Sequence, residues 1–212
     1  MNKKMRANLL LLLTAMIWGA SFVFQVSGME HVGPITFQGI RLLFAAAVLV
    51  PVVIIMNKGK GPLFAPEKKE ENKNILFGGI CCGLDLFAAC ILQQFGCVFT
   101  TAGKAAFITT LYVVIVPIFS LFLRKRVRPI MWVCVVLGVI GLYLLAMPNG
   151  FGSVSKGDFF VILCAVAFAV HIMVCDHFVA KNDGVKLSLI QFLTAGILGC
   201  ILMFIFETPN FD

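Results

Sequence analysis

The chain has 212 residues, of which 60% are hydrophobic and only 13% are charged. So few charged side chains cannot cover the surface of a water-soluble domain of this length, so we exclude that class and infer that a membrane surrounds most of the chain. The net charge is +7 at pH 7. It does not require a nucleic-acid partner, because membrane proteins keep Lys and Arg on the cytoplasmic side during insertion.

Seven apolar stretches are each long enough to cross a membrane. A hydrocarbon core of roughly 30 Å needs about 20 apolar residues in a helix, at ~1.5 Å per residue. Gly, Pro and Asn separate the stretches, as is usual for turns. We therefore predict transmembrane helices over residues 7–27, 33–56, 75–98, 101–123, 128–147, 158–180 and 185–206.

The basic residues fall almost entirely on alternate connections between these helices. If the N-terminus is cytoplasmic, 14 of the 17 Lys and Arg residues lie on inner connections, and the others are Arg41, Lys104 and Lys156. Acidic residues hardly affect this bias. We therefore predict a multi-pass protein of the cell membrane (inner or plasma membrane) with a cytoplasmic N-terminus.

Nothing in the sequence predicts an enzyme, a cofactor or a metal site. The eight cysteines lie in or at the ends of apolar stretches, without CxxC or Cys/His ligand spacing. HExxH, GxSxG and phosphate-binding glycine loops are also absent from the sequence. A retinal-type receptor would need a lysine deep in its last helix, and residues 187–206 contain none.

One face of the first predicted helix carries polar and aromatic residues at i, i+4, i+7 and i+11 spacing. A shift of 150 positions aligns the sixth helix with the first and the seventh with the second, as in an inverted repeat. The residues on this face are Thr14, Trp18, Ser21 and Gln25, and the shift aligns them with Cys164, Phe168, His171 and Cys175. The face is typical of a solute-binding wall, and equally of ordinary helix packing.

Three ionisable side chains, Arg41, Asp85 and His171, lie inside predicted helices. A charge there costs about 2.5–3.5 kcal/mol on insertion scales, so each is a functional candidate. Asp85 and His171 fall near the middle of the membrane, and Gln93 lies two turns from Asp85 on the same face. We predict that Asp85 and His171 bind solute and couple its movement to protons. Two alternatives for Arg41 stay open, a static ion pair with Asp85 and an outward, snorkelling side chain.

The fourth predicted helix, 101–123, carries Thr109 and Tyr112 on one side and Pro117 in its interior. Proline removes a backbone hydrogen bond, which membrane helices tolerate where a neighbour or water replaces it. A kink beside a cavity fits this pattern, and ordinary helix packing in the membrane is the alternative. For Lys104 at the outer end we expect a snorkelling anchor, with a substrate ligand as the alternative. Close packing of helices is indicated by two glycine pairs, Gly79-xxx-Gly83 and Gly138-xx-Gly141.

Several of these residues belong to short motifs in a characteristic order. The motifs are Trp18-Gly19-Ala20-Ser21-Phe22, Arg41, Thr101-Ala102-Gly103-Lys104-Ala105-Ala106-Phe107 followed by Pro117, and Gly138-Val139-Ile140-Gly141. In this order and spacing the chain resembles an EamA-type permease of the drug/metabolite transporter superfamily. The resemblance implies ten helices in two inverted five-helix repeats that export or exchange small organic solutes. A glutamate common in that family is absent between Leu123 and Val127, so no role of such an acid is carried over.

The resemblance divides the chain into two unequal parts. Residues 1–150 correspond to a first five-helix repeat, and residues 151–212 to the first two helices of a second, truncated repeat. We therefore expect the sequence to be a fragment or an early-terminated reading frame, with a complete seven-helix protein as the alternative.

The sequence thus predicts an all-α membrane protein, a polytopic bundle with seven of an expected ten transmembrane helices. We predict alternating-access transport of small organic metabolites or drugs, with proton coupling as an option. The predicted substrate-binding residues are Trp18, Ser21, Gln25, Asp85, Gln93, Tyr112, Phe168 and His171. The expected partners are a small-molecule substrate and the lipid bilayer, with a homodimer left open. The alternative function is a non-transporting membrane adaptor or an inactive, truncated permease.

Overall fold

The computed structural model describes residues 2–30, 32–58, 69–124, 127–146 and 155–207. Within these ranges all regular secondary structure is α-helical, as predicted. The helices are α1 (Lys3–Gly28), α2 (Pro34–Asn57), α3 (Lys69–Phe99), α4 (Ala102–Thr109), α5 (Tyr112–Phe122), α6 (Pro129–Ala146), α7 (Lys156–Val179) and α8 (Gly184–Phe206).

Six spans in the described part of the chain are long and apolar enough to cross a membrane, with α4 and α5 counted as one. α6, which corresponds to the fifth predicted helix, has 18 residues. α3 has 31 residues and begins at Lys69, ahead of its predicted start at residue 75. Its first turn contains Glu70 and Glu71, and acidic side chains stabilise the positive end of a helix dipole. The charged segment before the apolar stretch is therefore also helical.

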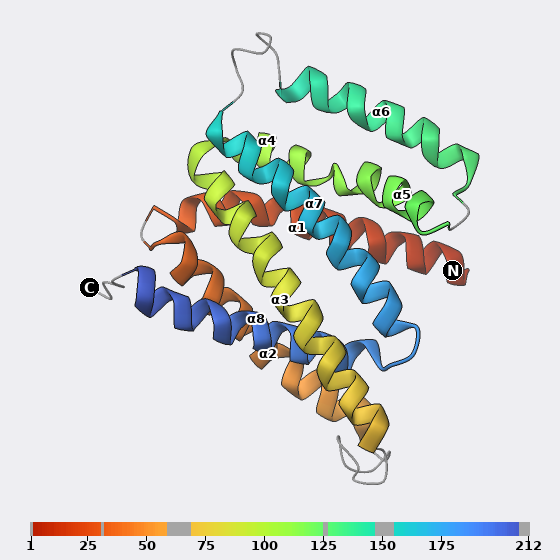
Figure 1. The fold of residues 1–212 in the computed structure, drawn as a ribbon, viewed down its shortest axis with the longest axis vertical. Helices are drawn as coiled ribbons and strands as arrows, with labels where there is room; N and C mark the ends of the chain where they lie inside the picture. Colours follow the sequence, from red (N-terminus) through yellow and green to blue (C-terminus); the bar gives the residue numbers. More distant parts are fainter. Residues whose placement is uncertain (1, 31, 59–68, 125–126, 147–154, 208–212) are drawn as a thin grey trace.

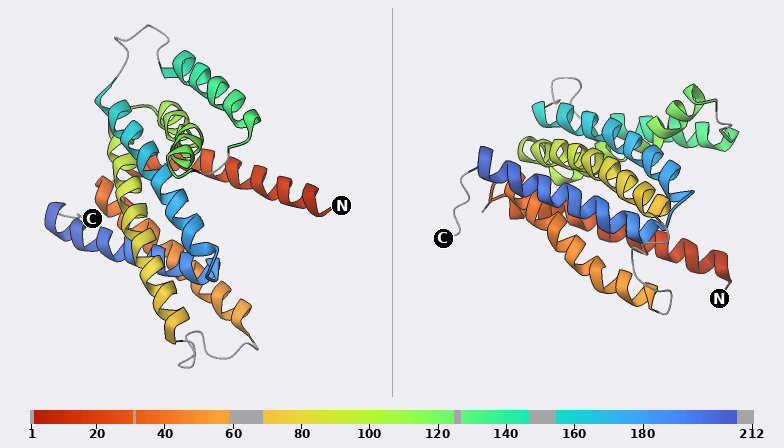
Figure 2. Two further views of the ribbon diagram at one scale, coloured as in Figure 1. Left: turned by 45° about the vertical axis from the view of Figure 1, so that its right-hand side comes forward. Right: turned by 60° about the horizontal axis from the view of Figure 1, so that its bottom comes forward.

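Four long helices stack side by side in the order α7, α3, α8 and α2 (Figure 2). Glycines let α3 and α8 approach closely. A Cβ atom on Gly79 would lie 2.5 Å from the Ile190 side chain, and one on Gly83 would lie 2.6 Å from the side chain of Thr194. The packing role predicted for this glycine pair is therefore confirmed.

α2 and α8 cross with their backbones in direct contact. A Cβ atom on Gly39 would lie 2.9 Å from the backbone nitrogen of Cys200, and one on Gly199 would lie 2.7 Å from the Cα atom of Gly39. At the end of α8, the Glu207 carboxylate accepts hydrogen bonds from the Thr36 backbone N–H (2.8 Å) and hydroxyl (2.6 Å). This carboxylate satisfies free N–H groups at the start of α2. The crossing and the cap together hold α2 on α8.

The fourth predicted helix is divided in two, which corrects the prediction of one helix over 101–123. At the break the Leu111 N–H donates to the carbonyl of Ile108 at 3.0 Å, three residues back instead of four. The Thr110 hydroxyl also donates to a backbone carbonyl three residues earlier, at 2.6 Å. Threonine hydroxyls compete with helical hydrogen bonds in this way. The break therefore precedes Pro117, which lies inside α5.

The helix ends gather at two opposite ends of the bundle. The N-terminus, the end of α5 and the turn between α7 and α8 lie at one end, while the start of α7 and the end of α8 lie at the other (Figure 1). α6 lies at the edge of the bundle, against α4 and α5. α3 contacts α1, α4 and α7 in addition to α2 and α8.

Candidate functional site

Three aromatic rings from three helices, α1, α5 and α7, lie against one another. Trp18 on α1 stacks on Tyr112 on α5, with ring centroids 5.9 Å apart and planes 19° from parallel. Phe168 on α7 lies 6.0 Å from Trp18 and 6.5 Å from Tyr112. Aromatic pairs at such distances contribute about 0.5–1.5 kcal/mol each beyond the area they bury. The structure thus brings together three predicted substrate-binding residues that are far apart in the sequence.

A cavity of about 140 Å³ lies beside these rings, between α1, α4 and α5. Trp18 and Tyr112 form part of its wall, and Thr109 forms another part next to the helix break. The Thr109 hydroxyl accepts a hydrogen bond from Nε2 of Gln93 at 3.2 Å, and both side chains are buried. Apolar rings with a few fixed polar groups are typical of small-molecule sites.

Asp85 on α3 faces His171 on α7. Nδ1 of His171 lies 3.7 Å from Oδ2 of Asp85, close enough for attraction between charges but too long for a hydrogen bond. The two side chains are 12% (His171) and 22% (Asp85) exposed. The His171 ring also lies 6.5 Å from the ring of Phe168. This contact joins the predicted proton-coupling pair to the aromatic cluster.

Gln25 lies further along the same face of α1 as Trp18. Its Nε2 donates to the Ser21 hydroxyl at 3.3 Å, and that hydroxyl donates to the Trp18 carbonyl at 2.6 Å. Gln25 is buried, and among the described residues its Oε1 has no hydrogen-bond partner. Ser21 is therefore engaged with its own helix, whereas Gln25 retains a buried acceptor.

Comparison with known proteins assigns the bundle to a family. The model of the EamA-like transporter family matches residues 5–147, which run from the first turn of α1 to the end of α6. The chain belongs to this family. The resemblance predicted from its short motifs is therefore confirmed, and the aromatic cluster and the Asp85–His171 pair lie in a member of the EamA-like transporter family.

Two curated relatives extend beyond this chain. An "Uncharacterized transporter" of Archaeoglobus fulgidus is 28% identical over 211 residues, which are 99% of this chain and 61% of the relative. The "Uncharacterized transporter YoaV" of Bacillus subtilis is 22% identical over 196 residues, which are 91% of this chain and 64% of the relative. This EamA-like chain thus spans less than two thirds of the length of either relative. No solved structure matches it.

The ion pair predicted between Arg41 and Asp85 does not form, which corrects that alternative. Arg41 donates from Nη2 to Oε1 of Gln38 on its own helix at 2.7 Å. It meets α3 beside Cys90, five residues from Asp85 and therefore about 7.5 Å further along the helix axis. Asp85 faces His171 instead. Arg41 is thus part of the packing between α2 and α3.

An ion pair at the end of this EamA-like bundle where α7 begins was not among the predicted contacts. Nζ of Lys104 lies 2.7 Å from Oδ2 of Asp158, and the Thr100 hydroxyl donates to the same carboxylate at 2.6 Å. Lys104 therefore points to an acid on α7 and is not the predicted snorkelling anchor. The sequence does contain a signal for this aspartate, because Ser155-x-x-Asp158 has the pattern of a helix capping box.

Hydropathy also does not predict which glutamines are buried. Gln94 on α3 is fully buried, and neither of its amide atoms has a hydrogen-bond partner in the described part of the chain. An unpaired buried amide costs about 1–3 kcal/mol, so Gln94 destabilises the described fold. No three His, Cys, Asp or Glu side chains among the described residues are arranged to hold a metal ion.

Proposed function

We propose that the chain takes part in the export or exchange of small organic metabolites or drugs, which bind between α1, α5 and α7. The observation that carries this proposal is the meeting of Trp18, Tyr112 and Phe168 in a member of the EamA-like transporter family. Aromatic faces attract flat apolar groups and cations. An amphipathic or aromatic solute therefore suits this site.

The size of the cavity supports alternating access as the mode of transport. Its volume of about 140 Å³ is below the roughly 300 Å³ at which small-molecule sites begin, so the rings must separate to admit a solute. The break between α4 and α5 provides a point at which that wall can bend. The Lys104–Asp158 pair closes α4 against α7 at the outer end. The proposed transport cycle opens one end at a time.

The placement in the membrane is also proposed. The chain lies in the cell inner membrane with the N-terminus in the cytoplasm, on the same side as the basic connection after α5. Residues 1–150 and 151–212 are a full and a partial repeat, and the ring contact of Trp18 with Phe168, which are 150 positions apart, supports this division. The partners are a small-molecule solute and the lipid bilayer, and a homodimer is compatible with this arrangement.

Replacing Trp18 by alanine should weaken solute binding roughly two- to tenfold, because the ring that would stack on the solute, a contact worth about 0.5–1.5 kcal/mol, is lost. Cells that express the full chain would first be screened for resistance to a panel of toxic aromatic and amphipathic compounds. Efflux of a compound so identified would then be measured against its concentration.

Trp132→Ala is the matched control, since Trp132 on α6 is 37% exposed, as is Trp18. It should leave efflux unchanged. Equal losses in the two variants would exclude the aromatic site. If the unsubstituted chain confers no resistance and moves no compound of the panel, the transport proposal is wrong and a non-transporting role is favoured.

Proton coupling is proposed for Asp85 and His171. Asp85→Asn keeps the size of the side chain but removes the titratable carboxyl group, so the rate of efflux should no longer depend on pH. The rate at different pH values would be measured in inside-out vesicles with and without a proton gradient. Asp176→Asn, at an exposed aspartate of α7, is the control. An unchanged pH dependence in Asp85→Asn would eliminate the coupling role.

A further inference from the structure

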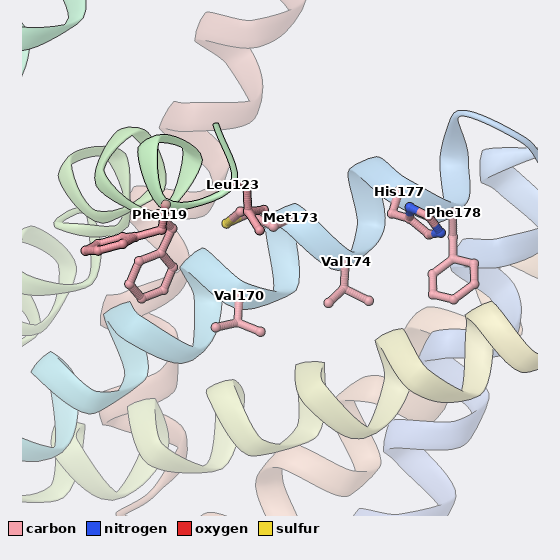
Figure 3. Close-up of a pocket in the computed structure, with 8 residues that line it drawn as sticks. Phe119, Leu123, Val170, Met173, Val174, His177 and Phe178 are labelled. Atoms are coloured by element: carbon pink, nitrogen blue, oxygen red, sulfur yellow. The ribbon is translucent and has the colours of Figure 1, made fainter. Parts of the chain in front are cut away.

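An apolar groove of about 440 Å³ runs along α7, next to the end of α5. It is separate from the cavity beside Trp18, and the two have no lining residue in common. Phe119 and Leu123 line it from the α5 side. Val170, Val174 and Phe178 line it from α7, at i, i+4 and i+8 on one helix face (Figure 3).

His177 is the one titratable residue in the wall of this groove, and it lies close to the end of α7. The other lining side chains carry no hydrogen-bonding group. A groove of this kind offers no hydrogen-bond partner to a polar solute. It suits an alkyl chain, which is stabilised by van der Waals contact and by burial of its apolar surface. The groove is therefore unlike the aromatic site, which offers Gln93 and Asp85 nearby.

Basic side chains lie at the end of the groove where α5 and α7 finish. Arg124 follows the lining residue Leu123 directly and is exposed, with a left-handed backbone angle φ of 55°. Lys181 follows α7 within one turn of His177 and is also exposed. The same end of the described chain also carries Arg128 and Lys186.

The acidic residues at this end do not balance that charge. Asp183 uses its carboxylate to cap α8, accepting from the backbone N–H of Val185 at 2.9 Å and of Lys186 at 3.3 Å. Asp176 is exposed and has an interaction of its own. With the start of α3 included, six basic residues at this end of the described chain (Lys69, Lys73, Arg124, Arg128, Lys181 and Lys186) outnumber four acidic ones (Glu70, Glu71, Asp176 and Asp183), so its net charge is positive.

We propose that the groove binds one acyl chain of an anionic phospholipid of the cytoplasmic leaflet, with the headgroup held by Arg124 and Lys181. The side of the membrane follows from the positive-inside bias, which places this end in the cytoplasm. Basic pockets between transmembrane helices on that side bind anionic headgroups, and each Lys or Arg near the surface contributes about 1 kcal/mol to attraction. The bilayer supplies this ligand wherever the protein is inserted.

A lipid bound in this groove affects how α5 and α7 pack against each other. An alkyl chain between Phe119 and Val174 fills the space between α5 and α7, the two helices that carry Tyr112 and Phe168. A bound lipid therefore supports the arrangement in which those rings are in contact. Only the effect of the lipid on transport rests on the proposed function. Lipid binding itself does not depend on that function.

The test is lipid retention by the full chain in phosphatidylcholine nanodiscs that contain a minor fraction of phosphatidylglycerol. Native mass spectrometry after release from the disc counts the lipids that remain on the protein. The unsubstituted chain should keep one phosphatidylglycerol in preference to phosphatidylcholine. Arg124→Gln should reduce this preference about fivefold, the equivalent of one surface cation. Val174→Trp should fill the groove and remove the retained lipid.

Two controls match these variants in chemistry and exposure. Lys58→Gln removes an exposed cation at the end of α2, and Val133→Trp adds the same ring to an exposed position of α6 outside the groove. Both should retain phosphatidylglycerol as the unsubstituted chain does. If Val174→Trp fails to fold, the proposal is tested by comparing the retention of phosphatidylglycerol in Arg124→Gln with that in Lys58→Gln.

Equal retention of the two lipids by the unsubstituted chain would overturn the proposal. So would unchanged retention of phosphatidylglycerol in a folded Val174→Trp protein. If the groove keeps no lipid and Val174→Trp slows solute efflux, the groove is a path for solute and the lipid site does not exist. Loss of efflux alone, with lipid retention as expected, would count against the proposed function and leave the lipid site intact.

Discussion

Replacing Gly39 by leucine is expected to force α2 and α8 apart and to destabilise the protein by about 3 kcal/mol or more. A Cβ atom at position 39 would lie 2.9 Å from the backbone carbon of Gly199 and 2.9 Å from the backbone nitrogen of Cys200. Backbone atoms of a helix cannot turn aside as a flexible side chain does. Overpacking of a tight contact costs about 1–3 kcal/mol, and leucine adds three carbon atoms beyond Cβ.

Gly19→Leu is the matched control because a Cβ atom there would have nothing within 4 Å. In a helix, leucine is more favourable than glycine by roughly 0.5–1 kcal/mol, so this variant should be at least as stable as the original chain. Stability would be measured in detergent as the temperature at which the buried thiols of Cys82 and Cys164 react with a fluorogenic maleimide. Equal midpoints for the two variants would show that the crossing is not a tight contact.

Replacing Asp158 by alanine should destabilise the protein by about 3–5 kcal/mol, because removing one partner of a buried ion pair leaves the other without compensation. The Asp158 side chain is 3% exposed and that of Lys104 is 18% exposed, with Nζ 2.7 Å from the carboxylate. The same carboxylate accepts from the Thr100 hydroxyl at 2.6 Å and from the Ser155 backbone N–H at 2.9 Å. The substitution thus releases α7 from α3 and α4 together.

The double variant Lys104→Met, Asp158→Ala distinguishes two effects on stability, the loss of the ion-pair attraction and the cost of leaving the Lys104 ammonium without a partner. It should be more stable than Asp158→Ala alone, since the uncompensated ammonium is gone. Asp176→Ala, at an exposed aspartate of the same helix, should change stability by no more than about 0.5 kcal/mol. The stability of all three variants is measured as the midpoint temperature of the thiol reaction. A double variant no more stable than the single one would mean that Lys104 is well solvated without its partner.

Much of the candidate site could be predicted because functional side chains are unusual in a membrane helix. Asp85 and His171 are exceptional in apolar stretches, so composition alone selects them. Trp18 and Phe168 were selected by helical spacing and by the shift of 150 positions. The structure places all four in one continuous group, which spacing within single helices could not establish.

The contacts that could not be predicted depend on distances between helices. Arg41 and Asp85 were both plausible ion-pair partners, but Arg41 meets α3 at Cys90 and Asp85 lies beside His171. Lys104 finds Asp158 because α4 packs against the start of α7. The break at Thr110 was also not predicted, because the apolar stretch of residues 101–123 continues on both sides of it.

The sequence by itself determined that this is an all-helical membrane protein, how many apolar stretches it has and which connections are basic. These are local properties, because each helix in lipid must satisfy its own backbone hydrogen bonds and each connection carries its own charge. Only the tertiary structure decided which helices touch, where the fourth span breaks and which side chains pair. In lipid no hydrophobic force selects the neighbours of a helix, so the choice depends on close fits such as Gly39 against Gly199.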